Sequence, residues 1–181
     1  IGTQKVITEH STIGLVITTD GSITDISREE YIEAEERVIE EMKNTGKPFA
    51  ILLNCADPSA QDASAIAENL NQKYSVPVLP VNCSTMSQEN INDIMQTILY
   101  EFPICEIGIN IPSWMVSLDY NEDLKASLTD AIKESFEPAS KVRHISECMN
   151  VLSNFPFIKR ANISSINAGS GCAMIDLQLP D

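Results

Sequence analysis

Three polar segments, each following a short apolar run, carry the side chains best suited to contact a ligand. They are Thr18-Thr19-Asp20-Gly21, Asn54-Cys55-Ala56-Asp57 and Asn82-Cys83-Ser84-Thr85. If the apolar runs are parallel strands, these segments meet outside the carboxyl ends of one sheet, where α/β proteins bind their ligands. A ligand site is therefore expected at that edge.

The second segment matches N-x-x-D, a reduced form of the N-K-x-D loop that reads guanine in P-loop GTPases. The Asp57 carboxylate only accepts hydrogen bonds, so it could take both the N1–H and N2–H₂ donors of guanine. Cys55 stands where that loop has a lysine, and it is too short to lay an aliphatic stem over a base. Since Asp57 precedes Pro58, it could equally form a turn or begin a helix. Both interpretations of Asp57 stay open at this stage.

Several catalytic and binding motifs are missing from the sequence. No G-x-x-x-x-G-K-[ST] phosphate loop occurs, and Gly169-Ser170-Gly171 is followed by Cys172 and Ala173. The two histidines and five cysteines show no metal-ligand or triad spacing, so we predict no metal site, no catalytic residue and no activity for this chain alone. The odd number of cysteines and their wide spacing favour a reducing cytoplasm.

Net charge argues against nucleic acid and anionic lipid as partners, and hydropathy argues against a membrane-spanning segment. The 181 residues carry a formal charge of −14, with a pI near 4.4. Such a surface repels nucleic acid and anionic lipid. No run approaches the roughly 20 apolar residues that span a bilayer.

The first hundred residues alternate between strand and helix patterns. Strands are predicted at residues 13–18, 50–54 and 76–81, the last at a sheet edge because Pro77 and Pro80 lack ladder donors. Helices are predicted to begin with Ser27, Ser59 and Ser87 as caps. Their buried faces are listed in order: Tyr31, Ala34, Val38 and Met42; Ala63, Ile66, Ala67, Leu70 and Tyr74; and Ile91, Ile94, Met95, Ile98, Leu99 and Phe102.

The remaining residues indicate a different arrangement. Ile107, Ile109 and Ile111 alternate as in a strand with one covered face, and Trp114 is expected in the core. Two helices follow, the second capped by Ser140. Strands at 158–167 and 172–179 form a hairpin whose glycines supply positive φ angles.

The pattern predicts an α/β fold: a partial, GTPase-like P-loop sheet, doubly wound and parallel, in residues 1–104, then an α+β segment with a C-terminal β-hairpin in residues 105–181. The chain starts without Met and stops just after a strand, so we expect a fragment of a longer protein. The strand at 13–18 would then have an exposed edge. We expect dimerisation, residues 1–9 or missing upstream residues to cover it.

Long ordered stretches resemble one protein family. The run from IGTQKVITEHSTIGLVITTDGS to KPFAILLN, then KYSVPVLPVNC, LYEFPICEIGINIPSWM and the terminal hairpin, is similar to the stage IV sporulation protein A family. The resemblance implies an ATP-hydrolysing protein that uses ATP and Mg²⁺ and self-assembles into the basement layer of the bacterial spore coat. It implies a mother-cell cytoplasmic location at the forespore surface. Implied partners are other coat proteins and a small amphipathic membrane peptide, with peripheral membrane contact.

The resemblance also assigns roles at the strand ends. Asn54 is expected to orient its loop, and Asn82, Cys83 and Ser84 to flank the base. Asp57 is interpreted as a relic of guanine recognition or as a helix cap. The phosphate loop would lie upstream. Two alternatives remain: a non-catalytic α/β interaction module, and, with less support, a response-regulator receiver, whose acidic cluster is missing after residues 13–18.

Overall fold

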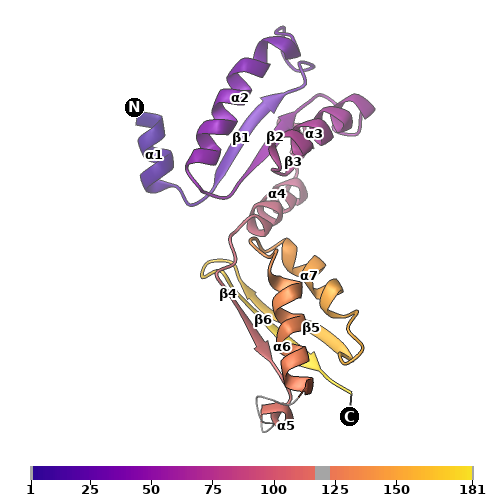
Figure 1. The fold of residues 1–181 in the computed structure, drawn as a ribbon. Helices are drawn as coiled ribbons and strands as arrows, with labels where there is room; N and C mark the ends of the chain where they lie inside the picture. The colour runs from indigo at the N-terminus through magenta and orange to yellow at the C-terminus, as the bar shows by residue number, and fades with distance from the viewer. Residues whose placement is uncertain (1, 117–122, 181) are drawn as a thin grey trace. The chain divides into compact units, whose positions relative to one another are not determined.

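The computed structural model describes residues 2–116 and 123–180. The chain divides into two compact units, Ile1–Leu99 and Tyr100–Asp181. Each unit contains one three-stranded sheet (Figure 1). The predicted α/β class is therefore confirmed.

The first unit is a parallel sheet with helical connections. Its elements are α1 (Gly2–His10), β1 (Gly14–Thr19), α2 (Arg28–Asn44), β2 (Phe49–Asn54), α3 (Gln61–Tyr74), β3 (Val78–Val81) and most of α4 (Gln88–Tyr100). The strand order is β1-β2-β3, and both pairs are parallel. Asn54 lies opposite Thr19 on one side and Val81 on the other, so all three strands end at one rim.

The central strand β2 explains why its sequence is apolar without alternation. Residues 49–53 are all buried, because a strand in the middle of a parallel sheet is covered on both faces. The proline-containing β3 lies at the edge, as predicted. Val16, Ile39, Ile51 and Leu70 belong to one core cluster, so α2 and α3 cover the same face of the sheet.

The other edge strand, β1, remains partly uncovered. Leu15 is 41% exposed and Ile17 is 62% exposed, although Ile17 is the register partner of buried Leu52. Among the described residues, no strand pairs with the outer edge of β1. The segment expected to cover this edge forms helix α1, whose Ile7 packs against the core cluster of this unit. Dimerisation through β1 stays a prediction.

Helix α2 turns inward a face that shares only Met42 with the predicted one. Its buried residues are Glu35, Ile39 and Met42, whereas Ala34 and Val38 are exposed. The apolar stripe was assigned wrongly because an internal carboxylate, Glu35, occupies a core-facing position. Ser27 is the N-cap residue, but its side chain makes no capping hydrogen bond.

The other two helix starts give mixed outcomes. Ser87 caps α4 as predicted, because its hydroxyl accepts from the Asn90 amide (3.2 Å). Ser59 does not cap α3, whose N-cap residue is Ala60. The predicted α3 face is confirmed, since Ala63, Ala67, Leu70 and Tyr74 are buried. In α4 only Ile94 and Ile98 are buried, and Ile91, Met95 and Leu99 are 40 to 50% exposed.

The second unit packs helices on a mixed sheet. Its elements are β4 (Glu106–Asn110), α5 (Ser113–Val116), α6 (Asp123–Phe136), α7 (His144–Leu152), β5 (Arg160–Asn167) and β6 (Cys172–Gln178). The order is β4-β6-β5, with β4 parallel and β5 antiparallel to β6. The β5–β6 pair is the predicted hairpin, and in its turn Gly171 has a positive φ of 68°.

Two details of this unit differ from the prediction. Trp114 is 45% exposed, because the short helix α5 buries its neighbour Met115 instead. Helix α7 begins at His144, so Ser140 lies too early to be its N-cap. The Ser140 amide instead contacts His144 Nδ1 (3.3 Å) in the turn before the helix.

The segment entering the second unit is fixed there by a buried ion-pair cluster. The side chain of Glu101 is 3% exposed and meets Lys141 Nζ at 2.6 Å and Arg143 Nη1 at 2.9 Å. Beside it, the Val142 amide donates to the Phe102 carbonyl (3.0 Å). The cluster therefore joins two parts of the chain about forty residues apart.

Candidate functional site

The carboxyl ends of β2 and β3 are joined by the side chains that the sequence singled out. Asn54 Oδ1 accepts a hydrogen bond from the Cys83 amide (3.0 Å), and Asn82 Nδ2 donates to the Ala56 carbonyl (2.9 Å). Asn82 Oδ1 also accepts from the Ser84 amide (3.0 Å). Both asparagines thus shape the two loops that follow the strands.

The loop after β1 reaches the same rim through Asp20, which the sequence singled out, and Ser22, which it did not. Ser22 Oγ accepts from the Ala56 amide (2.8 Å). Asp20 Oδ1 in turn accepts from the amide (2.9 Å) and hydroxyl (2.6 Å) of Ser22. All three strand ends are therefore linked by side-chain hydrogen bonds, and we refer to residues 20–22, 54–57 and 82–84 as the rim.

Asp57 does not cap helix α3. Its carboxylate accepts from the hydroxyl (2.6 Å) and the amide (2.9 Å) of Ser59, forming a turn before the helix. These two bonds, the hydroxyl first, lower the pKa of Asp57. Its Oδ1 atom is thus committed to a local turn, and the helix-cap interpretation is wrong.

Cys55 points into the protein and not over a ligand. It is fully buried, and its Sγ lies 3.7 Å from the Val81 carbonyl oxygen. Burial, followed by the negative charge of Asp20, raises the pKa of this thiol. A neutral buried thiol cannot replace the lysine stem of the guanine-reading loop. Cys83, by contrast, is exposed at the rim.

The two carboxylates of the rim are hydrogen-bond acceptors. The Oδ1 atoms of Asp20 and Asp57 accept from Ser22 and Ser59, and the negative charge of both carboxylates disfavours a phosphate group at the rim. Among residues 2–116 and 123–180, no group of three or more His, Cys, Asp or Glu side chains could hold a metal ion.

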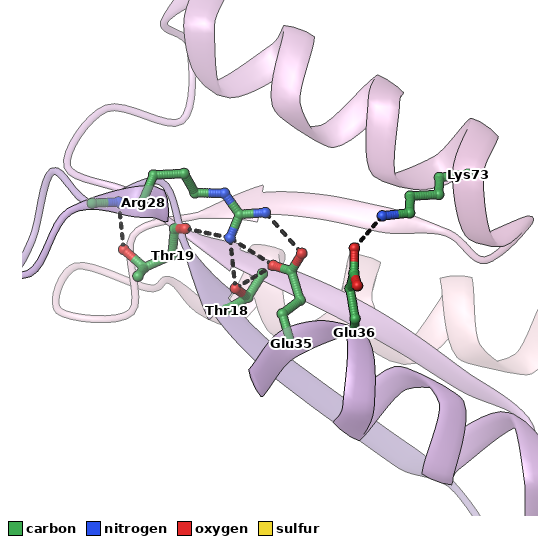
Figure 2. A network of polar contacts seen from close by, with 7 residues as sticks. Thr18, Thr19, Arg28, Glu35, Glu36 and Lys73 are labelled. Carbon is green, nitrogen blue, oxygen red and sulfur yellow. Dashed lines mark hydrogen bonds and ion pairs between the residues drawn. The ribbon is translucent and has the colours of Figure 1, made fainter. Parts of the chain in front are cut away.

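A buried ion pair beneath the rim was also missed. Arg28 Nη1 and Nη2 lie 2.6 and 2.8 Å from the Glu35 carboxylate oxygens, as Figure 2 shows. Arg28 also donates to the Thr18 hydroxyl and the Thr19 carbonyl, both at 3.1 Å. The seven-residue spacing of Arg28 and Glu35 puts both on one helix face, which was the available sequence signal.

Comparison with known proteins assigns both units to one family. A family model described as stage IV sporulation protein A, ATPase domain, matches residues 1–103. The middle domain model of that protein matches residues 104–181. The chain belongs to the stage IV sporulation protein A family. The resemblance stated from the sequence is confirmed.

Curated relatives agree along the whole chain. Stage IV sporulation protein A of Bacillus subtilis (strain 168) is 44% identical over 181 residues, covering 100% of this chain and 37% of the relative. The protein of that name from Clostridioides difficile (strain 630) is 43% identical over 178 residues, covering 98% and 36%. The chain thus spans little more than a third of these relatives. No solved structure matches it.

Family membership implies a role in sporulation and an ATPase domain. The rim lies within the part matched by the ATPase domain, residues 1–103. No helix in the described part of the chain is long and apolar enough to cross a membrane. The binding roles of Asn54, Asp57, Asn82, Cys83 and Ser84 stay predictions.

Proposed function

We propose that the chain is part of an ATP-hydrolysing morphogenetic protein that self-assembles into the basement layer of the bacterial spore coat. Residues 1–104 are the latter half of its nucleotide-binding domain, and residues 105–181 begin its middle domain. The observation that carries this proposal is the meeting of three strand ends at one rim, inside the region that matches an ATPase domain.

The rim contacts the base end of ATP, with Asn54 and Asn82 holding the two loops in place and Cys83 and Ser84 flanking the base. The triphosphate and Mg²⁺ bind to residues upstream of this chain, since the sequence contains no G-x-x-x-x-G-K-[ST]. ATP and Mg²⁺ are cofactors of the full-length protein. The chain alone binds neither and does not hydrolyse ATP.

Guanine selectivity is lost at this rim. The Asp57 turn with Ser59 and the inward position of Cys55 support this view. Asp57 is then a relic of a guanine-reading loop, kept because it shapes the turn before α3.

The full-length protein acts in the mother-cell cytoplasm at the forespore surface. Its partners are further copies of itself, other spore coat proteins and a small amphipathic membrane peptide. It contacts the membrane only peripherally and binds no nucleic acid. The formal charge of −14 supports the exclusion of nucleic acid.

Phosphate release from ATP and GTP by the full-length protein tests this function, together with sedimentation of its polymers. We expect ATP hydrolysis, ATP-dependent pelleting, and an unchanged nucleotide preference in Asp57→Ala. The chain of 181 residues is the control and should release no phosphate. Faster hydrolysis of GTP than ATP, reversed by Asp57→Ala, would contradict the relic interpretation.

The alternative is a non-catalytic α/β interaction module. The outward face of α2, with exposed Glu29, Glu33 and Glu40, favours it as a recruiting surface. A full-length protein that binds coat partners but releases no phosphate from ATP would establish this alternative.

A further inference from the structure

We propose that Arg28 and Glu35 are positioning residues of the nucleotide site: together they close the loop 20–27 at its base and thereby set the rim. This inference rests on the proposed ATP-binding function. The ion pair lies between the end of β1 and the first turns of α2 (Figure 2).

Arg28 holds both ends of the loop. The loop leaves β1 after Thr19 and ends where α2 begins, at Arg28 itself. The Arg28 side chain then folds back and donates to the Thr19 carbonyl and the Thr18 hydroxyl. Gly21 has a φ of +88° and packs closely on the start of α2. A Cβ at this position would lie 3.0 Å from the backbone nitrogen of Arg28.

Glu35 holds the guanidinium in this orientation. Its side chain is 3% exposed, that of Arg28 is 16% exposed, and the pair is bidentate. The Thr18 hydroxyl donates a hydrogen bond to Glu35 (2.5 Å), so Thr18, Arg28 and Glu35 all contact one another. A buried fork-shaped pair fixes direction as well as distance, because both N–H groups must face both oxygens.

The closed loop carries the hydrogen bonds that reach the rim. The Gly21 amide donates to Thr19 Oγ1 (3.1 Å), and one residue later Ser22 accepts from the Ala56 amide. Ala56 in turn is held by Asn82. The ion pair is thus connected by consecutive contacts to the loops after β2 and β3. Releasing the loop should leave the rim unformed until a base binds, which weakens binding through the cost of ordering.

A neighbouring ion pair, between Glu36 of α2 and Lys73 of α3, provides a matched control. Lys73 Nζ and Glu36 Oε1 lie 2.5 Å apart, but these side chains are 50% and 45% exposed, whereas those of Arg28 and Glu35 are 16% and 3% exposed. Glu35→Gln and Glu36→Gln make the same chemical change at adjacent positions. In Glu35→Gln the new amide group places a donor against the donors of Arg28.

The test compares the affinity of the full-length protein for ATP and for inorganic tripolyphosphate, which lacks a base. Glu35→Gln should weaken ATP binding by about tenfold, or 1.4 kcal/mol, and leave tripolyphosphate binding unchanged. Glu36→Gln should change neither. Amide hydrogen exchange should accelerate at Gly21, Ser22 and Ala56 in Glu35→Gln, while the amides of β2 keep their protection.

A second variant separates positioning from stability. Arg28→Met/Glu35→Leu replaces the pair by apolar side chains and removes the donors to Thr18 and Thr19. It should unfold at the wild-type temperature or above it, yet bind ATP as weakly as Glu35→Gln. If Glu35→Gln does not fold, this variant alone decides.

Wild-type ATP affinity in the folded variants would overturn the inference, as would equal loss of ATP and tripolyphosphate binding. A wild-type protein that binds neither ligand would overturn the proposed function and the inference with it. A wild-type protein that binds ATP while Glu35→Gln also does so normally would overturn only the inference.

Discussion

The ion-pair cluster around Glu101 predicts how three variants rank in their free energy of unfolding. The Glu101 side chain is 3% exposed, whereas those of Lys141 and Arg143 are 34% and 37% exposed. If Glu101 is removed, both cations can turn to water. If both cations are removed, the carboxylate stays buried without them.

Removing the partners of a buried charge costs about 3–5 kcal/mol. We therefore expect Lys141→Met/Arg143→Met to lower the free energy of unfolding of the second unit by that amount. Glu101→Gln loses only charge-assisted hydrogen bonds to side chains that can rehydrate, so we expect about 1–2 kcal/mol. The triple variant with Glu101→Leu should recover most of the loss, because no buried charge remains.

Trp114 provides the assay. It is the only tryptophan in the chain and lies in the second unit, so its fluorescence in urea follows the unfolding of that unit. The free energy of unfolding is compared at fixed pH and salt. An equal cost for Glu101→Gln and for the double variant would refute the reasoning, since the burial of the charge would then not set the penalty.

Three further predictions concern the first unit. Ser87→Ala should lower the free energy of unfolding of that unit by about 1 kcal/mol, measured in urea, because the cap of α4 is lost. Cys83 should react with Ellman's reagent in the folded protein, whereas Cys55 should react only after unfolding, because it is buried and its pKa is raised. Ser59→Ala should move the pKa of Asp57 upward toward its ordinary value in an NMR titration. The Ser59 hydroxyl, which lowers this pKa more than the Ser59 amide does, is removed.

The sign of the Asp57 effect on stability follows from linkage. Its pKa is lowered in the folded state, so its stabilising contribution is present above the unfolded pKa and disappears as the pH falls through the folded value. Ser59→Ala should make this acid-side loss smaller. An unchanged Asp57 titration would show that the turn does not hold the carboxylate. Rapid labelling of folded Cys55, or unaltered unfolding of Ser87→Ala, would contradict the other two predictions.

The sequence predicted the sheet and the placement of its ends because both follow from local patterns. An unbroken apolar run such as residues 49–53 is typical of a central parallel strand, and parallel strands bring Asn54 and Asn82 to one rim. The hydrogen bonds that the Asn54 and Asn82 side chains make to the loops could not be predicted in the same way. Which backbone groups they hold depends on loop geometry that no spacing rule specifies.

The inward face of α2 could not be predicted from hydropathy. Glu35 is charged, so a search for apolar periodicity selects Val38 and leaves Glu35 outside. Arg28, one heptad earlier, and the Thr18 hydroxyl compensate the buried carboxylate. The contacts of Arg28 and Glu35 with the end of β1 are tertiary contacts, which local propensity does not predict.

The strand order of the second unit has a consequence for how a nascent chain acquires its shape. Strand β6 lies between β4 and β5, yet it is synthesised after both. Asn110 must wait for Asp176, 66 residues later, before its side chain finds the carboxylate that it contacts at 2.7 Å. Until the ribosome has released β6, β4 has no neighbour in its sheet, so this unit should mature late and slowly.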